Sequence, residues 1–399
     1  MRYNKEKGKA GGKKLVIGII GAGASGMAAA LAASEQKENT VILMERQNRV
    51  GKKLLATGNG RCNLTNLHAD SRGYHGMEPQ FVRCALSKYN VSDTLQWFEE
   101  LGLITVCEDS GRVYPYSDQA NSVVDVLRFA LNRENIILKL GFEVCKIKKL
   151  DSGFVVESKE DTVFCDRLIV ACGGLAGTQL GGSMSGYQLL HSMGHRVTKL
   201  RPALVQLRCA DSVAALKGVR ANCMAQIYKD GTLFSESTGE IQFTDYGISG
   251  PVIFEISRDV CREKGEWLCK LDFLPHVEQV QLERLICRDG EEMLTGIVHN
   301  RLGKMLAKAG DYDRKQVSKI AKEYVLRLQE PLGMDKAQVT AGGIVTADFD
   351  AQTMQSKLVP GLYACGEVLD IDGDCGGYNL QWAWSSGRSA GYHAGRMEE

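Results

Sequence analysis

Net charge is the first thing that this 399-residue sequence lacks. Its 49 Lys and Arg residues stand against 48 Asp and Glu residues, which leaves a formal charge of +1. A near-neutral chain has no overall field that attracts nucleic acid or an anionic membrane surface, so we expect neither as a partner. Basic residues are concentrated only in the segment 2–14, which holds six of them and one acid. We interpret that segment as a solvated leader.

Cysteine pairs and metal-ligand clusters are also missing. The 13 cysteines form no Cys-x-x-Cys pair and do not cluster with the 7 histidines. This pattern is typical of free thiols in a reducing compartment, so we predict a cytoplasmic protein without disulfides or a metal site. No run is hydrophobic enough to span a membrane, because the uncharged stretch 15–34 is interrupted by four glycines.

That stretch has the pattern of a strand, a glycine-rich turn and a helix. Residues 15–20 form a short apolar, β-branched run that is typical of a buried strand. The turn sequence GAGASG follows, and residues 27–33 are rich in alanine, which favours a helix. Residues 40–44 form a second apolar run. Together they predict a βαβ unit of about thirty residues.

The turn carries the glycine spacing of a dinucleotide-binding site. Gly21 permits the sharp turn, Gly23 lets a diphosphate approach the backbone, and Gly26 lets the helix pack on the strand. The diphosphate would lie at the helix N-terminus, where free N–H groups and the helix dipole favour negative charge. Glu45, at the end of the second strand, can accept hydrogen bonds from an adenosine ribose and disfavours the 2′-phosphate of NADP.

Later parts of the chain favour FAD over NAD. The buried strand at 168–172 ends at Gly173 and Gly174, and the strand at 362–365 ends at Gly366 and Glu367. Small residues at the carboxyl ends of parallel strands are where α/β sheets bind ligands. A long loop at 51–66 has neither helical nor strand period. These segments can contact the ribityl chain and isoalloxazine ring of a flavin.

The middle of the chain has a different pattern. Residues 197–275 contain short alternating runs and predict a β-rich inserted domain, and residues 276–335 predict a helical insertion. The clearest helix of that insertion places Val317, Ile320, Ala321, Tyr324, Val325 and Leu328 on one stripe. Residues 1–196 and 336–399 would then form one discontinuous nucleotide-binding domain, with a final helix at 385–395.

Several longer motifs resemble those of one flavoprotein family. They are GAGASGMAAA at 21–30, GKKLLATGNGRCNLTN at 51–66, SGYQLLHSMGH at 185–195, FTDYGISGP at 243–251 and the long segment 339–391, which includes GEVLDIDGDCGGYNLQ. The chain is similar to the BaiN/YhiN-like flavoproteins, also called the aminoacetone-oxidase-like family. The resemblance covers nearly the whole chain. Asp245 stands where that family usually has His, which puts the charge preference at this position in doubt.

The resemblance implies an α/β fold: a Rossmann-like FAD-binding domain of the two-dinucleotide-binding flavoprotein type, with inserted β-barrel-like and helical domains. It also implies that residues 57–63 line the FAD, that Val144 meets the adenine, that Glu367 or Asp374 holds the ribityl or diphosphate side, and that residues 377–380 face the flavin pyrimidine ring. The full set that we predict to bind FAD is Gly21, Gly23, Ala24, Ser25, Gly26, Glu45, Arg46, Lys53, Thr57, Gly58, Asn59, Gly60, Arg61, Cys62, Asn63, Val144, Ala171, Gly173, Gly174, Gly366, Glu367, Asp374, Gly377, Tyr378, Asn379 and Leu380.

The function expected from these observations is an FAD-dependent oxidoreductase that moves hydride between flavin and a small organic substrate. The residues do not choose between amine and steroid-like substrates, or between NAD(P)H and oxygen as the other reactant. Two alternatives stay open, a flavin-dependent nucleic-acid-modifying protein and a non-catalytic flavin redox sensor. The sequence identifies no catalytic residue, although Asp245 and Tyr246 are candidates for facing the substrate. Cys62, beside Arg61, is a candidate redox thiol, for which a packing role is the alternative.

Overall fold

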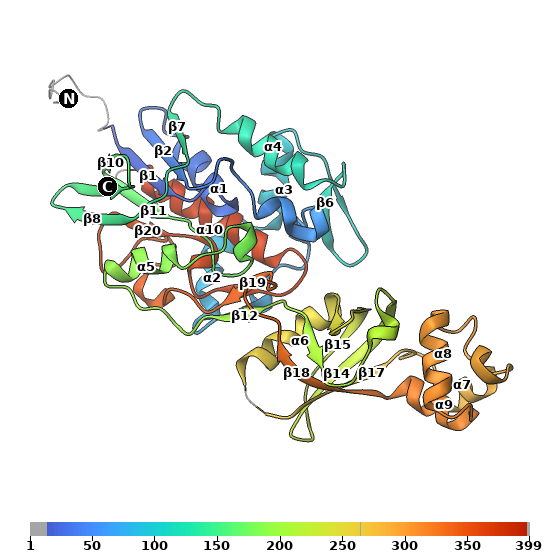
Figure 1. Cartoon of the computed structure of the whole chain (residues 1–399). Helices are drawn as coiled ribbons and strands as arrows, with labels where there is room; N and C mark the ends of the chain where they lie inside the picture. Colours follow the sequence, from blue (N-terminus) through green and yellow to red (C-terminus); the bar gives the residue numbers. More distant parts are fainter. Residues whose placement is uncertain (1–13, 264, 397–399) are drawn as a thin grey trace. The chain divides into compact units, whose positions relative to one another are not determined.

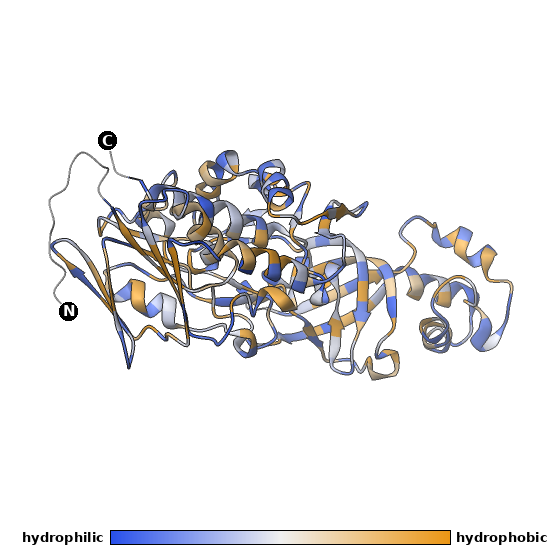
Figure 2. Ribbon diagram, turned by 90° about the horizontal axis from the view of Figure 1, so that it is seen from above, coloured by the Kyte–Doolittle hydropathy of each residue, from blue (hydrophilic) through white to orange (hydrophobic). Residues whose placement is uncertain are grey.

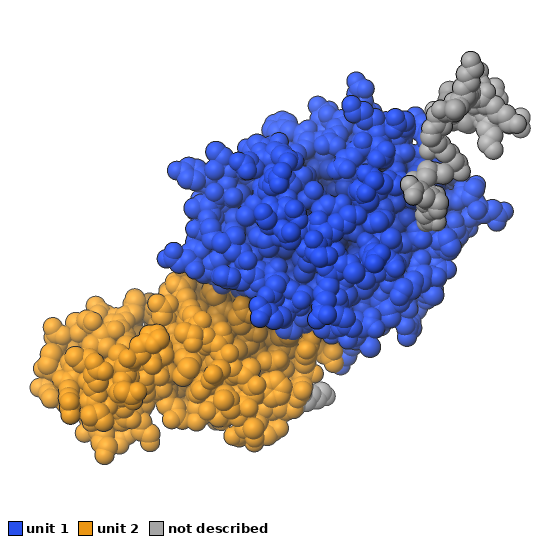
Figure 3. All heavy atoms as spheres, turned by 180° about the vertical axis from the view of Figure 1, so that it is seen from behind, with its two compact units in different colours: residues 1–174, 180–199, 342–399 blue, residues 175–179, 200–341 orange. Residues whose placement is uncertain are grey.

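The computed structural model describes residues 14–263 and 265–396. The basic leader therefore lies, apart from Lys14, outside the described residues. Contacts divide the chain into two compact units, which Figure 3 colours separately: unit 1 comprises residues 1–174, 180–199 and 342–399, and unit 2 comprises residues 175–179 and 200–341. Unit 1 thus contains both ends of the chain, as a discontinuous domain does.

Unit 1 is built on a parallel sheet of five strands in the order β20-β11-β1-β2-β7 (Figure 1). Its strands are β1 (Val16–Ile20), β2 (Thr40–Glu45), β7 (Ile136–Leu140), β11 (Arg167–Val170) and β20 (Leu362–Ala364). The three central strands are nearly continuous runs of buried apolar residues, as expected for a sheet covered on both faces. Figure 2 shows these strands largely in the hydrophobic colour. The first and last thirds of the sequence meet here, because β11 pairs with β1 on one side and β20 on the other.

Two helices from opposite ends of the chain pack closely in unit 1. Helix α1 (Ala24–Ala33) is almost entirely buried, and α10 (Tyr378–Ala394) lies against it. The small residues of both helices permit this approach, since a Cβ on Gly387 would lie 2.3 Å from the Ser25 carbonyl oxygen and one on Gly391 would lie 2.1 Å from that of Ala29. The predicted final helix is confirmed, but it begins at Tyr378, earlier than the predicted start at 385.

The other elements of unit 1 surround this core. A small antiparallel sheet has the order β3-β6-β5, a hairpin sheet has the order β10-β9-β8, and β21 pairs with β4. The bounds are β3 (Thr65–Asn66), β4 (Tyr74–His75), α2 (Val82–Lys88), α3 (Val91–Glu100), β5 (Thr105–Cys107), β6 (Arg112–Pro115), α4 (Ala120–Ala130), β8 (Lys146–Leu150), β9 (Gly153–Glu157), β10 (Thr162–Cys165), α5 (Ser185–Ser192) and β21 (Asp372–Gly373).

Unit 2 contains a closed antiparallel barrel in the order β13-β16-β15-β14-β17-β18. Helix α6 packs on the barrel, and three helices follow β17 along the chain before β18 returns to it. The bounds are β12 (Arg201–Ala203), β13 (Leu207–Cys209), β14 (Arg220–Lys229), β15 (Thr232–Phe243), β16 (Gly247–Ser249), α6 (Pro251–Arg262), β17 (Trp267–Asp272), α7 (Gln279–Leu285), α8 (Asn300–Ala309), α9 (Arg314–Lys322), β18 (Tyr324–Pro331) and β19 (Val339–Ala341).

The prediction of one helix running through Leu328 is wrong. Helix α9 ends at Lys322, and Tyr324–Pro331 is the strand β18, which pairs with β17 and with β13 and so closes the barrel. The β-rich and helical regions lie together in unit 2, and their division into two domains stays a prediction. Among the described residues, no helix combines the length and hydrophobicity needed to cross a membrane.

Candidate functional site

The glycine-rich turn between β1 and α1 has the backbone that its sequence predicts. Gly21 has φ +100°, and a Cβ there would lie 2.5 Å from the Ala171 carbonyl oxygen. A Cβ on Gly26 would lie 1.8 Å from the Gly21 carbonyl oxygen, so only glycine fits. Gly23 differs, because a Cβ there would meet nothing within 4 Å and its φ of −80° is open to any residue. The protein itself therefore does not explain a glycine at position 23.

Glu45 closes this turn from the end of β2. Its Oε2 accepts a hydrogen bond from the Ala22 N–H at 2.7 Å, and its Oε1 accepts one from the Gln47 N–H at 2.9 Å. The two bonds hold the carboxylate beside the glycine-rich turn, at the point where the strand ends. A carboxylate so placed has further lone pairs for hydroxyl donors. The assignment of Glu45 to a ribose stays a prediction.

The carboxyl ends of three parallel strands meet at this turn. The end of β11 packs directly on it, through Ala171 against Gly21 and Gly26. The end of β20 reaches the start of α1, since a Cβ on Gly366 would lie 2.5 Å from the Ser25 Oγ. Gly173 has φ +70°, and a Cβ there would also meet nothing within 4 Å. The structure thus brings together small residues that lie up to 345 positions apart.

The loop at 51–63 starts at the same place. The Gly51 N–H donates to the Ala22 carbonyl oxygen at 2.9 Å, and Lys53 forms a 2.7 Å ion pair with Glu367 at the end of β20. Within the loop, the backbone turns through positive φ at Gly58, Asn59, Gly60 and Cys62. The Oδ1 of Asn63 is buried and has no hydrogen-bond partner among the described residues. An unsatisfied buried acceptor of this kind is unusual and fits a ligand donor.

Cys62 and Arg61 do not interact as a redox thiol would require. Cys62 is fully buried, and burial raises the pKa of its thiol to about 12, although a hydrogen bond with Thr57 acts in the opposite direction. The Arg61 guanidinium instead pairs with Asp118 and Glu108. Without a thiolate near neutral pH, Cys62 is a poor nucleophile. The packing interpretation of Cys62 therefore holds.

The segment before α10 lies against the strand β3. A Cβ on Gly377, which has φ +106° and precedes the first turn of α10, would lie 2.4 Å from the Thr65 carbonyl group. The Asn66 Nδ2 donates to the Gly376 carbonyl oxygen at 2.9 Å. The Asn379 side chain accepts from the Gly373 N–H and donates to the Gly373 carbonyl oxygen, both at 2.8 Å. Helix α10 thus begins beside β3, the strand that follows the 51–63 loop, and its first turn holds no acidic residue.

Other residues predicted to bind FAD lie near the end of β2, after β11 and in the first turn of α10. Arg46 donates to the Gly181 carbonyl oxygen, and the backbone at 141–142 pairs with Glu45 and Gln47, which places buried Val144 beyond the end of β2. A hollow of about 470 Å³ opens beside the loop, lined by Asn48, Arg49, Lys52, Leu55, Ala56 and Leu180. Leu380 lies in the first turn of α10, and Gly174 follows β11. Whether any of these residues contacts a cofactor stays a prediction.

Sequence reasoning missed the side chains that join the loop to α10. Thr65 donates to the Gln381 Oε1 at 2.6 Å, and the Trp384 Nε1 donates to the Leu64 carbonyl oxygen at 2.9 Å. It also missed His75, whose ring bonds to Asp374 at 2.6 Å. These partners are about 300 residues apart, so no short-range spacing could have identified them.

Asp245 and Tyr246 belong to unit 2. Asp245 is exposed and forms a 2.8 Å ion pair with Lys217. The hydrogen bond from Lys217 lowers the pKa of Asp245, so this carboxylate is ionised at neutral pH. Tyr246 packs against a small apolar cluster that includes Val205 and Leu332. Whether either residue faces a substrate stays a prediction.

These features fit a dinucleotide. Gly23 leaves its surroundings open for a diphosphate, α1 and α10 both begin without a side-chain cap, and Asn63 presents an unsatisfied acceptor. Backbone N–H groups at such helix starts stabilise negative charge. The arrangement can therefore hold an anionic group at α1 and stabilise charge that develops near α10.

Comparisons with known proteins agree with this geometry. Residues 15–393 match the family described as HI0933-like protein Rossmann domain. A 3-dehydro-bile acid delta(4,6)-reductase from Clostridium scindens is 39% identical, over 94% of this chain and 98% of the relative. A ribosomal RNA dihydrouridine synthase from Escherichia coli is 31% identical, over 92% of this chain and 95% of the relative.

A solved flavocytochrome c3 fumarate reductase in its open conformation is also similar, with 18% identity and a TM-score of 0.49, over 96% of this chain and 78% of that one. The family match covers nearly the whole chain. The resemblance inferred from the motifs and the predicted Rossmann-type α/β fold are therefore confirmed.

Proposed function

This chain belongs to the HI0933-like Rossmann-domain family, and from that premise we propose that it is an FAD-dependent reductase of carbon–carbon double bonds conjugated to a carbonyl group. The single observation that carries the proposal is the convergence of β1, β11 and β20 on one glycine-rich turn. The diphosphate would lie over Gly23, the ribose at Glu45, and the isoalloxazine ring between the 57–63 loop and the start of α10. When bound, the flavin supplies the hydride.

The residues of the chain supply the rest of the chemistry. N–H groups at the start of α10 would stabilise the negative charge that a reduced flavin carries near N1 and O2, and preorganised donors of this kind contribute about 3 kcal/mol. The ion pair between Lys53 and Glu367 links the 51–63 loop to the end of β20, and both segments are proposed to line the cofactor site. The full set of cofactor-binding residues predicted from the sequence belongs to this proposal.

The choice of reaction rests on what the two named relatives share. A delta(4,6)-reductase of a 3-dehydro-bile acid and a dihydrouridine synthase both saturate a double bond conjugated to a carbonyl group. We favour a small polycyclic or other small enone as substrate, because the relative acting on a bile acid is more similar and the chain carries a formal charge of only +1. A uridine in RNA is the second candidate, supported by the synthase relative.

Three measurements test the proposal. Chromatography of the cofactor released by denaturation should identify FAD. Anaerobic addition of NADH or NADPH should bleach the flavin spectrum, with the nicotinamide binding transiently. A 3-oxo-4,6-diene bile acid should then restore the oxidised spectrum, with loss of the dienone absorbance.

The outcomes separate the alternatives. Recovery of colour with ribosomal RNA and not with any enone would select the RNA candidate. A flavin that stays reduced with both substrates would favour a redox sensor. A well-folded protein that is colourless and does not bind added FAD would refute the proposal as a whole.

A further inference from the structure

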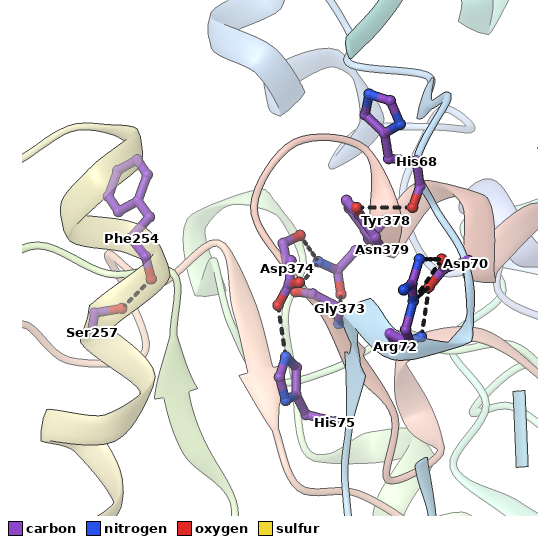
Figure 4. A network of polar contacts seen from close by, with 10 residues as sticks. All are labelled: His68, Asp70, Arg72, His75, Phe254, Ser257, Gly373, Asp374, Tyr378 and Asn379. Atoms are coloured by element: carbon purple, nitrogen blue, oxygen red, sulfur yellow. Dashed lines mark hydrogen bonds and ion pairs between the residues drawn. The ribbon is translucent and has the colours of Figure 1, made fainter. Parts of the chain in front are cut away.

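A histidine–carboxylate pair lies in unit 1, where Asp374 precedes α10 by a few residues and His75 lies on β4 (Figure 4). The His75 Nε2 and the Asp374 Oδ1 are 2.6 Å apart, and the side chains of His75 and Asp374 are 32% and 36% exposed. Neither side chain is sealed in the core, so a ligand can reach the pair. Asp374 lies three residues before Gly377, where the segment proposed to face the flavin ring begins.

The backbone of Asp374 is held by two hydrogen bonds. The Asp374 N–H donates to the Gly73 carbonyl oxygen at 2.9 Å, and its carbonyl oxygen accepts from the Asn379 Nδ2 at 3.3 Å. Gly73 permits this approach, because a Cβ there would lie 2.9 Å from the Asp374 Oδ2 and 2.3 Å from the ring of Tyr378. The backbone of Asp374 is thus held by the Gly73 carbonyl group on one side and by the Asn379 side chain on the other.

The imidazole is held on one side only. His75 lies on β4, directly opposite Asp372 of β21, and this ladder fixes its backbone. Its Nε2 faces Asp374, whereas its Nδ1 has no hydrogen-bond partner among the described residues. The nearby phenols are engaged elsewhere, since the Tyr74 hydroxyl donates to the Tyr378 carbonyl oxygen and the Tyr378 hydroxyl to that of His68, both at 3.0 Å.

This arrangement is that of a proton donor with its orienting group. A carboxylate that accepts a hydrogen bond from one ring nitrogen fixes the orientation of the imidazole, and in the protonated ring the other nitrogen can donate. Reduction of a conjugated double bond needs such a donor, because hydride transfer leaves a pair of electrons on the carbon next to the carbonyl group.

We propose that His75 is the proton donor of the reductase reaction and that Asp374 is its positioning residue. The hydride and its electron pair go from the reduced flavin to the β-carbon, the electrons of the double bond move to the α-carbon, and the His75 Nδ1–H supplies the proton that forms the new C–H bond there. The imidazole is left neutral and takes a proton from water. This inference rests on the proposed function.

The test compares His75→Gln with His68→Gln in the flavin-loaded full chain. Glutamine keeps a side-chain donor for Asp374 but cannot deliver a proton. His68 is the control, because it lies nearby and its exposed ring makes no hydrogen bond to another described residue. In a rapid-mixing experiment, reduction of the flavin by dithionite should be equal in all variants. Reoxidation by the dienone should be slower by about 100-fold or more in His75→Gln and unchanged in His68→Gln.

Two further readouts exclude a merely structural role. Exogenous imidazole should restore reoxidation in His75→Ala, and Asp374→Asn should slow reoxidation when the rate is measured per bound flavin. Wild-type rates in His75→Gln, or a loss of flavin content without rescue by imidazole, would overturn the inference alone. A wild-type chain that reduces no enone at all would overturn the proposed function, and this inference with it.

Discussion

Gly23 gives the sharpest test of where the cofactor binds. A Cβ added at this position meets no atom within 4 Å, and its φ of −80° and ψ of −167° suit alanine. The substitution Gly23→Ala should therefore leave the folded protein nearly intact. Alanine is a poorer N-cap than glycine, so we expect at most about 1 kcal/mol lost from the free energy of unfolding of the flavin-free protein.

The effect on flavin binding should be much larger. The added methyl group would occupy the space in which the diphosphate approaches the backbone of α1, and it would push the phosphates away from the N–H donors. Hydrogen bonds to a charged group contribute about 1.5–3 kcal/mol each. Loss of one or two of them predicts a destabilisation of about 3 kcal/mol, roughly a 100-fold rise in the Kd for FAD.

Gly26→Ala is the matched control. It adds the same methyl group three residues further on, where the Cβ would lie 1.8 Å from the Gly21 carbonyl oxygen. Because both partners are backbone, the turn or the helix must move, at a cost of about 1–3 kcal/mol or more. Urea unfolding of the flavin-free proteins and titration with FAD, followed by quenching of flavin fluorescence, measure the two effects separately. Wild-type affinity in Gly23→Ala would refute the placement of the diphosphate.

Three further predictions concern Glu45 and the cysteines. Glu45→Ala removes the acceptor of the Ala22 N–H and the proposed ribose contact, so FAD retention on gel filtration should fall, whereas Glu45→Gln should retain more. Iodoacetamide at pH 8 should label the exposed Cys107, Cys145 and Cys287, detected by mass spectrometry, well before Cys62, whose pKa burial raises to about 12. Burial also raises from 9.0 to about 12 the pKa values of Cys165, Cys172 and Cys365. These four thiols bind protons more tightly in the folded protein than in the unfolded chain. Their contribution to the free energy of unfolding is therefore complete below pH 9 and is lost as the pH rises to 12. The urea concentration at the midpoint of unfolding should fall as the pH rises over that range and not below it.

The parts of the fold that the sequence predicted well are those determined locally. The first βαβ unit depends on residues within thirty positions of one another. In its turn, the structure shows the steric reason for glycine at positions 21 and 26, where a Cβ would clash, but not at Gly23. The strand ends at Gly173 and Gly366 were also recognised locally, as apolar runs that stop at glycine. Parallel sheets with both faces covered have such runs, so the pattern is informative without a partner strand.

The contacts across the site could not be predicted in the same way. Lys53 and Glu367 are 314 positions apart, and His75 and Asp374 are 299 positions apart. A salt bridge or a histidine–carboxylate pair leaves no periodic trace in the sequence, because each partner is a single polar residue. Only the pairing of β20 with β11, and of β21 with β4, brings these residues into range.

The strand β18 shows how tertiary pairing overrides a helical pattern. Tyr324, Val325 and Leu328 continue the helical spacing of α9, yet they also lie in a run whose alternate residues can face a barrel interior. In the structure Leu326 is buried and Val325 is 42% exposed, which is the strand phase. Without β18, β17 and β13 would present open edges, and unpaired strand edges are costly. The three helices α7–α9 are therefore an insertion between two neighbouring barrel strands, and the chain must complete the barrel before it can return to the parallel sheet at β20.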